Sequence, residues 1–77
     1  MEHELKVLPE YFAAVSDGRK NFEIRRTDRE YKTGDTVLLK EWTGTEFTGR
    51  EVKRDIRYIL RDCPEYGLMQ GYCILGF

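Results

Sequence analysis

The stretch GRKNFEIR, residues 18–25, decides the fold because hydrophobic periodicity changes there from helical to strand spacing. Before it, Phe12 and Val15 lie three residues apart and share one face of a predicted helix over 9–17, which Gly18 ends. After it, residues 20–26 alternate with a period of two. We predict a strand over 20–26 with Phe22 and Ile24 on its apolar face, opposite Glu23 and Arg25 on its polar face.

Outward from this stretch, alternation and turn residues predict the remaining elements. On the N-terminal side a short strand over 3–7 precedes Pro9, which suits a first helical turn. The predicted elements on the C-terminal side are a turn over 27–35, a strand over 36–42, a hairpin loop over 43–49, a long half-exposed strand over 50–60, a loop over 61–70 and a final strand over 72–77. We therefore expect an α+β fold: a small, mostly antiparallel sheet of about five strands that curls toward a barrel, with one N-terminal helix.

Length and charge limit what such a chain does. Seventy-seven residues suffice for one domain, predicted over 1–77, and are too few for two separate cores. The formal net charge of -1 provides no long-range field for nucleic acid, so a phosphate site requires a local basic patch. No stretch of 18 consecutive apolar residues occurs, so we expect a cytoplasmic protein with no membrane contact.

The residues that most often bind metals are isolated from one another. Cys63 and Cys73 are ten positions apart, which is not the spacing of a zinc or redox motif, and His3 is the single histidine. We expect two free thiols, with Cys73 buried in the final apolar run. The sequence therefore predicts neither a metal site nor a cofactor.

Two interpretations of the charged residues in GRKNFEIR remain open. Lys20 and Arg25 suit contacts with a phosphate or a base edge, and Glu23 suits orienting Arg25 or accepting from an exocyclic amine. The same three residues also suit a solvated ladder of weak ion pairs on the surface. Spacing alone does not decide between these interpretations.

The stretch resembles the G-x-K-x-x-E-x-R motif of ASCH domains, relatives of the PUA domain that are associated with RNA. The resemblance extends along nearly the whole chain to the compact DUF3850 branch, through residues 3–12, Asp28-Arg29, Gly34-Asp35 and the closing 71–77. It implies a PUA-like barrel with a cleft beside the helix, into which Lys20, Glu23 and Arg25 would point.

Some members of this superfamily are enzymes. In the small amidohydrolase branch, which acts on a modified cytidine, a threonine follows the motif lysine three positions later, whereas this chain has Glu23 there. Without that hydroxyl, Lys20 as base and Glu23 as acid are the remaining candidates for catalysis. The resemblance therefore leaves open whether the chain is an enzyme.

Three further residues are candidate ligand contacts. His3 suits an acid, a base or a phosphate contact, and Arg29 extends the basic cluster although Asp28-Arg29 also suits turn capping. Trp42, beside the predicted hairpin, suits a platform for base stacking or a cap on the core. Among the other aromatic residues, we expect a mostly buried group and a group near loops: Tyr11, Phe12, Phe22, Tyr58, Tyr72 and Phe77 in the first, and Tyr31 and Phe47 in the second.

These observations favour a domain that binds a single-stranded RNA segment or a nucleotide in a cleft beside the helix. One alternative is a small hydrolase acting on a modified nucleoside or an RNA linkage. The other is a non-catalytic interaction module of phage or mobile-element origin. The missing threonine favours binding over amide hydrolysis.

Overall fold

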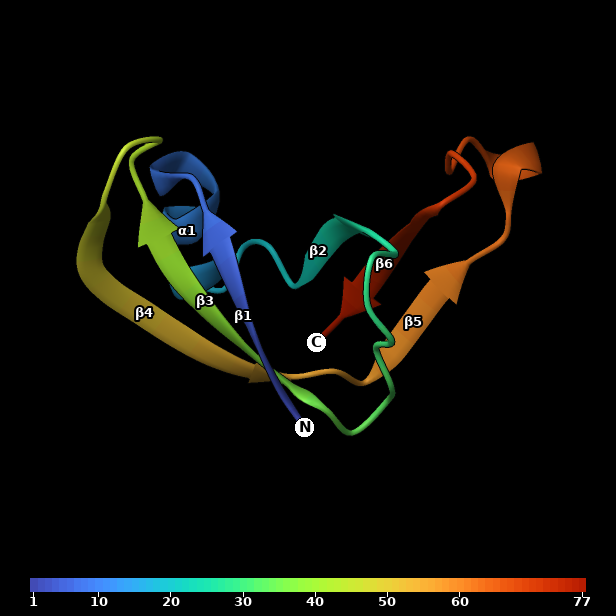
Figure 1. The fold of residues 1–77 in the computed structure, drawn as a ribbon, viewed down its shortest axis with the longest axis horizontal. Coiled ribbons are helices and arrows are strands. Elements are labelled where there is room, and N and C mark those ends of the chain that lie inside the picture. The colour runs from blue at the N-terminus through green and yellow to red at the C-terminus, as the bar shows by residue number, and fades with distance from the viewer.

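The computed structural model describes all 77 residues as one helix, one short 3-10 turn and six strands (Figure 1). In chain order the elements are β1 (Glu2–Val7), α1 (Pro9–Ser16), β2 (Phe22–Arg26), β3 (Thr36–Trp42), β4 (Phe47–Asp55), β5 (Tyr58–Arg61), η1 (Pro64–Tyr66) and β6 (Tyr72–Gly76). The predicted helix and the strands predicted over 3–7, 20–26, 36–42 and 72–77 are confirmed to within two residues at each end.

The six strands form two separate three-stranded sheets. The first sheet has the order β1-β3-β4, with β1 parallel to β3 and β4 antiparallel to it, and the second has the order β2-β6-β5, entirely antiparallel. The α+β class with one N-terminal helix is thus confirmed. The sheets diverge in Figure 1 and do not close into the expected barrel.

The single strand predicted over 50–60 is wrong, because the chain leaves one sheet and enters the other within it. β4 ends at Asp55 and β5 begins at Tyr58. Between them the N–H of Ile56 donates to Asp35 O, and the N–H of Arg57 donates to Gly76 O in the second sheet. The Ile56 side chain is 1% exposed at this junction. The alternation of apolar residues continues through the break, so the pattern alone does not show it.

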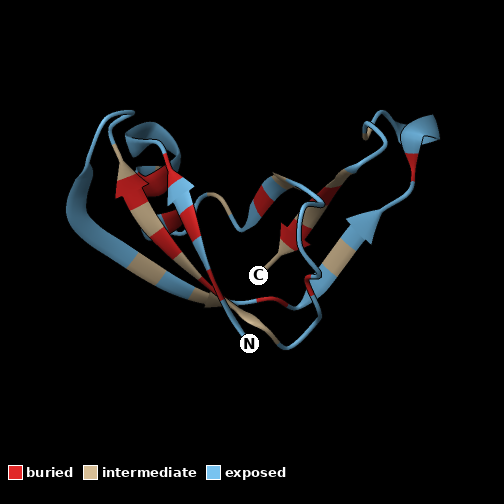
Figure 2. Cartoon of the chain, in the orientation of Figure 1, coloured by how far each residue is buried: buried red, intermediate tan, exposed pale blue.

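Helix α1 covers one face of the first sheet. Pro9 begins the helix, Phe12 and Val15 are its buried residues, and the positive φ of Gly18 turns the chain toward β2. A single buried cluster joins these two side chains to both sheets and to the loop before β3; its other members are Leu5, Val7, Tyr31, Val37, Leu39, Ile56, Cys73 and Leu75. In Figure 2 the buried positions accordingly concentrate on β1, β3, α1 and β6, whereas β4 and β5 are mostly exposed.

Several aromatic side chains lie elsewhere than the sequence predicts. Tyr11, Phe22 and Tyr58 were expected in the core and are 46%, 43% and 67% exposed. Tyr31 lies in a loop as expected, but it is buried, and its ring packs edge-on against His3 with the ring centroids 4.8 Å apart. Burial raises the pKa of the Tyr31 hydroxyl. The loop over 27–35 therefore contributes to the core, while β2 and β5 expose aromatic rings.

Both cysteines are free thiols, as the spacing predicts, and Cys63 is buried as well as Cys73. Helix α1 is too short to cross a membrane, and no other α-helix is present.

Candidate functional site

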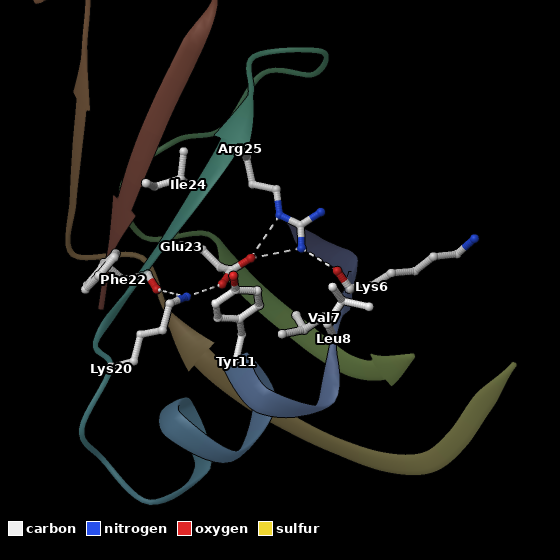
Figure 3. A pocket seen from close by; sticks show the side chains of 9 residues that line it. All are labelled: Lys6, Val7, Leu8, Tyr11, Lys20, Phe22, Glu23, Ile24 and Arg25. Atoms are coloured by element: carbon white, nitrogen blue, oxygen red, sulfur yellow. Dashed lines mark hydrogen bonds and ion pairs between the residues drawn. The ribbon is translucent and has the colours of Figure 1, made fainter. Parts of the chain in front are cut away.

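The motif stretch forms one side of an open pocket between the start of α1 and strand β2 (Figure 3). The pocket has a volume of about 510 Å³. Its walls come from the end of β1, the first turn of α1, the loop after α1 and β2; the lining residues are Lys6, Val7, Leu8, Tyr11, Lys20, Phe22, Glu23, Ile24 and Arg25. The three motif side chains are thus brought together in one place.

The buried and exposed faces of strand β2 are exchanged relative to the prediction, which placed Phe22 and Ile24 on the apolar face and Glu23 on the polar face. Glu23 is 6% exposed, whereas its neighbours Phe22 and Ile24 are 43% and 54% exposed. An isolated buried carboxylate is strongly unfavourable, so this arrangement requires cationic partners close by. Side chains of Lys20 and Arg25 provide them from the two sides.

Glu23 accepts hydrogen bonds at both carboxylate oxygens. Lys20 Nζ donates to Glu23 Oε1 at 2.6 Å, and Arg25 donates to Oε2 from Nε at 3.1 Å and from Nη2 at 2.9 Å. Lys20 Nζ also donates to Phe22 O at 2.9 Å, and Arg25 Nη2 donates to Lys6 O. These bonds, drawn in Figure 3, link β2 to the loop after α1 and to the end of β1. The three side chains therefore pair with one another, as in the ladder interpretation, but their carboxylate is buried beside a pocket and is not solvated.

Both cations keep hydrogen-bond donors that are not used inside the protein. A lysine ammonium has three N–H groups and a guanidinium has five. Lys20 donates to two protein oxygens, and Arg25 uses Nε and Nη2 while Nη1 has no protein acceptor. The side chains of Lys20 and Arg25 are 17% and 25% exposed. A ligand in the pocket can therefore receive hydrogen bonds from two cations that Glu23 already holds in position.

The rest of the pocket wall is largely apolar. Lys20 Nζ lies 5.5 Å from the ring centroid of Tyr11 and 5.0 Å from that of Phe22, so the ammonium lies close to both aromatic rings. Leu8 and Ile24 are also exposed at this site. Aromatic and aliphatic walls above a few fixed polar groups are typical of small-molecule sites.

His3 and Arg29 lie outside this pocket. They line a second hollow of about 690 Å³ near the N-terminus, together with Asp35. His3 is 4% exposed and its Nε2 lies 2.8 Å from Asp35 Oδ2. Arg29 pairs with Asp28 at 3.7 Å and its guanidinium lies 5.8 Å from the Tyr31 ring centroid. The structure thus places His3 in a structural contact rather than beside Lys20.

Trp42 also lies away from the motif residues. Its ring packs edge-on against Phe47 with the centroids 4.8 Å apart, and Lys6 Nζ lies 4.3 Å from the Trp42 ring centroid. Lys6 lines the motif pocket and also contacts Trp42. Trp42 is therefore at the periphery of the candidate site.

Six of the nine lining residues are not among the candidates that the sequence indicates: Lys6, Val7, Leu8, Tyr11, Phe22 and Ile24. Lys6 contributes its backbone carbonyl, which no side-chain pattern reveals. Tyr11 lies one position before the buried Phe12, and helical spacing places it at the edge of the apolar face. This position beside the buried Phe12 is the one feature of the sequence that could have indicated that Tyr11 lines a site at the helix edge.

The structure has no group of three or more His, Cys, Asp and Glu side chains arranged to hold a metal ion. Glu23 has two cationic neighbours instead of further carboxylates.

Residues 2–77 match the family model described as "Domain of unknown function (DUF3850)", and the chain belongs to that family. It is also similar to an "Uncharacterized 12.9 kDa protein in GpA 3'region" of Escherichia phage P2, with 46% identity over 54 residues. The alignment covers 70% of this chain and 50% of the phage protein, so the chain spans about half the length of that relative.

Proposed function

We propose that the pocket beside α1 binds a nucleotide or one nucleotide unit of a single-stranded RNA. The observation that supports this most strongly is the buried Glu23 carboxylate, which holds Lys20 and Arg25 below apolar walls. A nucleobase has two flat apolar faces and a polar edge, and bases in single strands commonly stack on aromatic side chains. The Tyr11 and Phe22 rings provide such surfaces.

The unused N–H groups of Lys20 and Arg25 suit a phosphate oxygen or a base carbonyl. A planar guanidinium forms directed pairs with phosphate, and an ammonium acts as a point charge. Glu23 orients both cations and has little remaining capacity to accept from a ligand, because it already accepts three hydrogen bonds. We therefore assign Lys20 and Arg25 to ligand contact and Glu23 to positioning.

The same geometry weighs against the hydrolase alternative. Glu23 is the acid in that alternative, and both oxygens of its carboxylate already accept hydrogen bonds from Lys20 and Arg25. Binding is therefore the function that the contacts of the pocket favour.

The convergence of Lys20, Glu23 and Arg25 on one pocket also supports the proposal that this family is part of the ASCH, PUA-like group. The resemblance places these three motif residues in a cleft beside the helix, and the pocket lies at that position relative to α1. Two open sheets stand here in place of a closed barrel.

The test is fluorescence anisotropy of a labelled, mixed-sequence single-stranded RNA at low and moderate salt. We expect saturable binding, and we expect Lys20→Ala and Arg25→Ala each to weaken it and to reduce the salt slope by about 0.7, the contribution of one phosphate contact in a single strand. Lys53→Ala is the matched control, because Lys53 is an exposed lysine of β4 that pairs with Glu2.

Thermal unfolding of each variant, followed by circular dichroism, verifies that the variant is folded at the assay temperature. Affinity unchanged in both Lys20→Ala and Arg25→Ala would remove the proposed site. Absence of any RNA or nucleotide binding at low salt would overturn the proposed function.

A further inference from the structure

The outer face of the second sheet carries apolar side chains that nothing in the chain covers. Residues directly opposite each other on neighbouring strands point to the same face. Phe22 and Ile24 of β2, Ile74 of β6, and Tyr58 and Leu60 of β5 therefore share this face. The exposed fractions of Tyr58 and Leu60 are 67% and 39%. A contiguous apolar face of this kind on a small domain marks a binding surface.

At one end of this face, a glycine separates two aromatic residues. Phe22 pairs with Gly76, and Gly76 pairs with Tyr58, so the three residues form one row across the sheet. Two strand spacings place Phe22 and Tyr58 about 9.6 Å apart at Cα. Neither ring stacks on another ring of the protein, since the close ring pairs are His3–Tyr31 and Trp42–Phe47. We call this row the slot: an aromatic residue lies on each side, and the glycine between them carries no side chain.

Backbone geometry does not require glycine at this position. Gly76 is the one glycine of the seven whose φ is not positive. A Cβ added at Gly76 would meet Tyr58 O at 3.4 Å, an ordinary contact. Glycine in a strand interior lowers stability relative to residues with side chains, and it often marks close approach of a ligand. Gly76 therefore leaves the space between Phe22 and Tyr58 without a side chain, although the backbone would accept one.

We propose that this slot binds a second nucleobase, next to the base bound in the pocket, so that the natural ligand is a single-stranded RNA of at least two nucleotides. This inference rests on the proposed function. Phe22 lines the pocket and also forms one side of the slot, and Figure 3 shows it at the margin of the pocket beside the end of β6. Stacked aromatic groups are about 3.4 Å apart. Two bases stacked on the opposite faces of the Phe22 ring would therefore be about 7 Å apart, and one would lie in the pocket and the other in the slot.

The charges around the face suit an anionic strand. Arg26 points to the same face as Phe22 and Ile24, and its guanidinium lies 5.7 Å from the ring centroid of Tyr72. Neither Arg26 nor the exposed Arg57 forms an ion pair within the protein. Glu23 is the one acidic residue in the strands of this sheet, and it is buried and paired on the other face. The phosphates of a bound strand would therefore lie near two unpaired arginines, and no exposed carboxylate of these three strands would repel them.

Calorimetric titration of adenosine 5′-monophosphate and of the 5′-phosphorylated dinucleotide pApA tests the slot. We expect the dinucleotide to bind between about 5-fold and about 150-fold more tightly, the range for one additional base–aromatic stack. Tyr58→Ala and Gly76→Val should each abolish that advantage and leave the monophosphate affinity unchanged. Tyr58→Phe should retain it, because a phenyl ring also stacks.

Tyr66→Ala is the matched control, because Tyr66 is 86% exposed in η1, outside the three strands. Equal affinity of the two ligands for the unchanged protein would overturn the slot while leaving the pocket intact, whereas no binding of either would overturn the proposed function itself. The slot is also overturned if sedimentation shows a dimer of the unchanged protein that Tyr58→Ala dissociates, since a second copy would then occupy this face.

Discussion

The two sheets of this protein differ in how much apolar surface they leave exposed, although both contribute to the one buried cluster. In the first sheet Leu5, Val37 and Leu39 point inward and are at most 3% exposed beneath helix α1. In the second sheet Ile24 and Leu60 point outward, while the charged Glu23 points inward. Burial stabilises the first sheet directly, at about 25 cal/mol per Å² of apolar surface. The second sheet leaves part of that stabilisation unused, and the same exposed side chains remain available to a ligand.

Truncating one leucine in each sheet gives the largest contrast. We expect Leu39→Ala to lower the free energy of unfolding by about 2–5 kcal/mol, because it leaves a cavity beneath α1. Leu60→Ala should lower it by less than about 1 kcal/mol, because its side chain is already 39% exposed. Urea unfolding at neutral pH measures both changes. Equal losses would mean that the outer face is covered in solution.

Neutralising one buried carboxylate gives the next largest effect. Glu23→Gln keeps the shape of the side chain but removes the charge between Lys20 and Arg25, and we expect a loss of about 1.5–3 kcal/mol, the range for hydrogen bonds to charged groups. The partly exposed cations limit the loss by remaining in contact with water.

Glu4→Gln is the control, because Glu4 pairs with Lys40 at 3.5 Å on the surface with its side chain 63% exposed. That variant should change stability by less than about 0.5 kcal/mol in the same urea experiment. A loss for Glu23→Gln no greater than for Glu4→Gln would show that the pocket floor does not depend on the buried charge.

The smallest expected effect is a change in how stability depends on pH below about pH 5. It concerns Asp35, at the junction between the sheets. Hydrogen bonds from His3, the amino terminus and the Lys32 backbone N–H lower the pKa of the Asp35 carboxyl from 3.8 to about 2. Because this pKa is lower in the folded state, the resulting stability is complete well above pH 4 and is lost as the pH falls toward 2.

Urea midpoints measured between pH 5 and pH 2 should therefore fall less steeply for Asp35→Asn than for the unchanged protein. Asp62→Asn is the control, because Asp62 forms no ion pair or side-chain hydrogen bond, and it should follow the unchanged protein. Parallel curves for Asp35→Asn and the unchanged protein would remove the assigned role of Asp35.

Local sequence patterns predicted most elements but not how the strands assemble. The helix over 9–17 follows from Pro9, Phe12 and Gly18, which are local start, packing and stop signals. The break at Ile56 escaped prediction because it depends on the carbonyl of Asp35 and on Gly76, about 20 residues away on either side. Alternation predicts a strand but carries no information on which sheet the strand joins.

The candidate site was predicted in part. Lys20, Glu23 and Arg25 were identified from the motif, and the structure brings them together in one pocket. The sequence predicts Tyr11 in the core because an apolar residue near the buried face of a helix usually packs there, whereas its ring lines the pocket wall. His3 and Trp42 were included on residue type alone, and the fold places both outside this pocket.

The sequence by itself determined the positions of the helix and most strands, the free thiols and the motif in which two cations flank one carboxylate, because each depends on residues close together in the chain. Only the tertiary structure decided which face of β2 is buried. The alternating pattern of a strand assigns its residues to two faces, but the pattern is the same whichever face is buried. The inward direction of Glu23 depends on partners held by the α1–β2 loop and by the end of β1, which meet β2 only when the chain is folded.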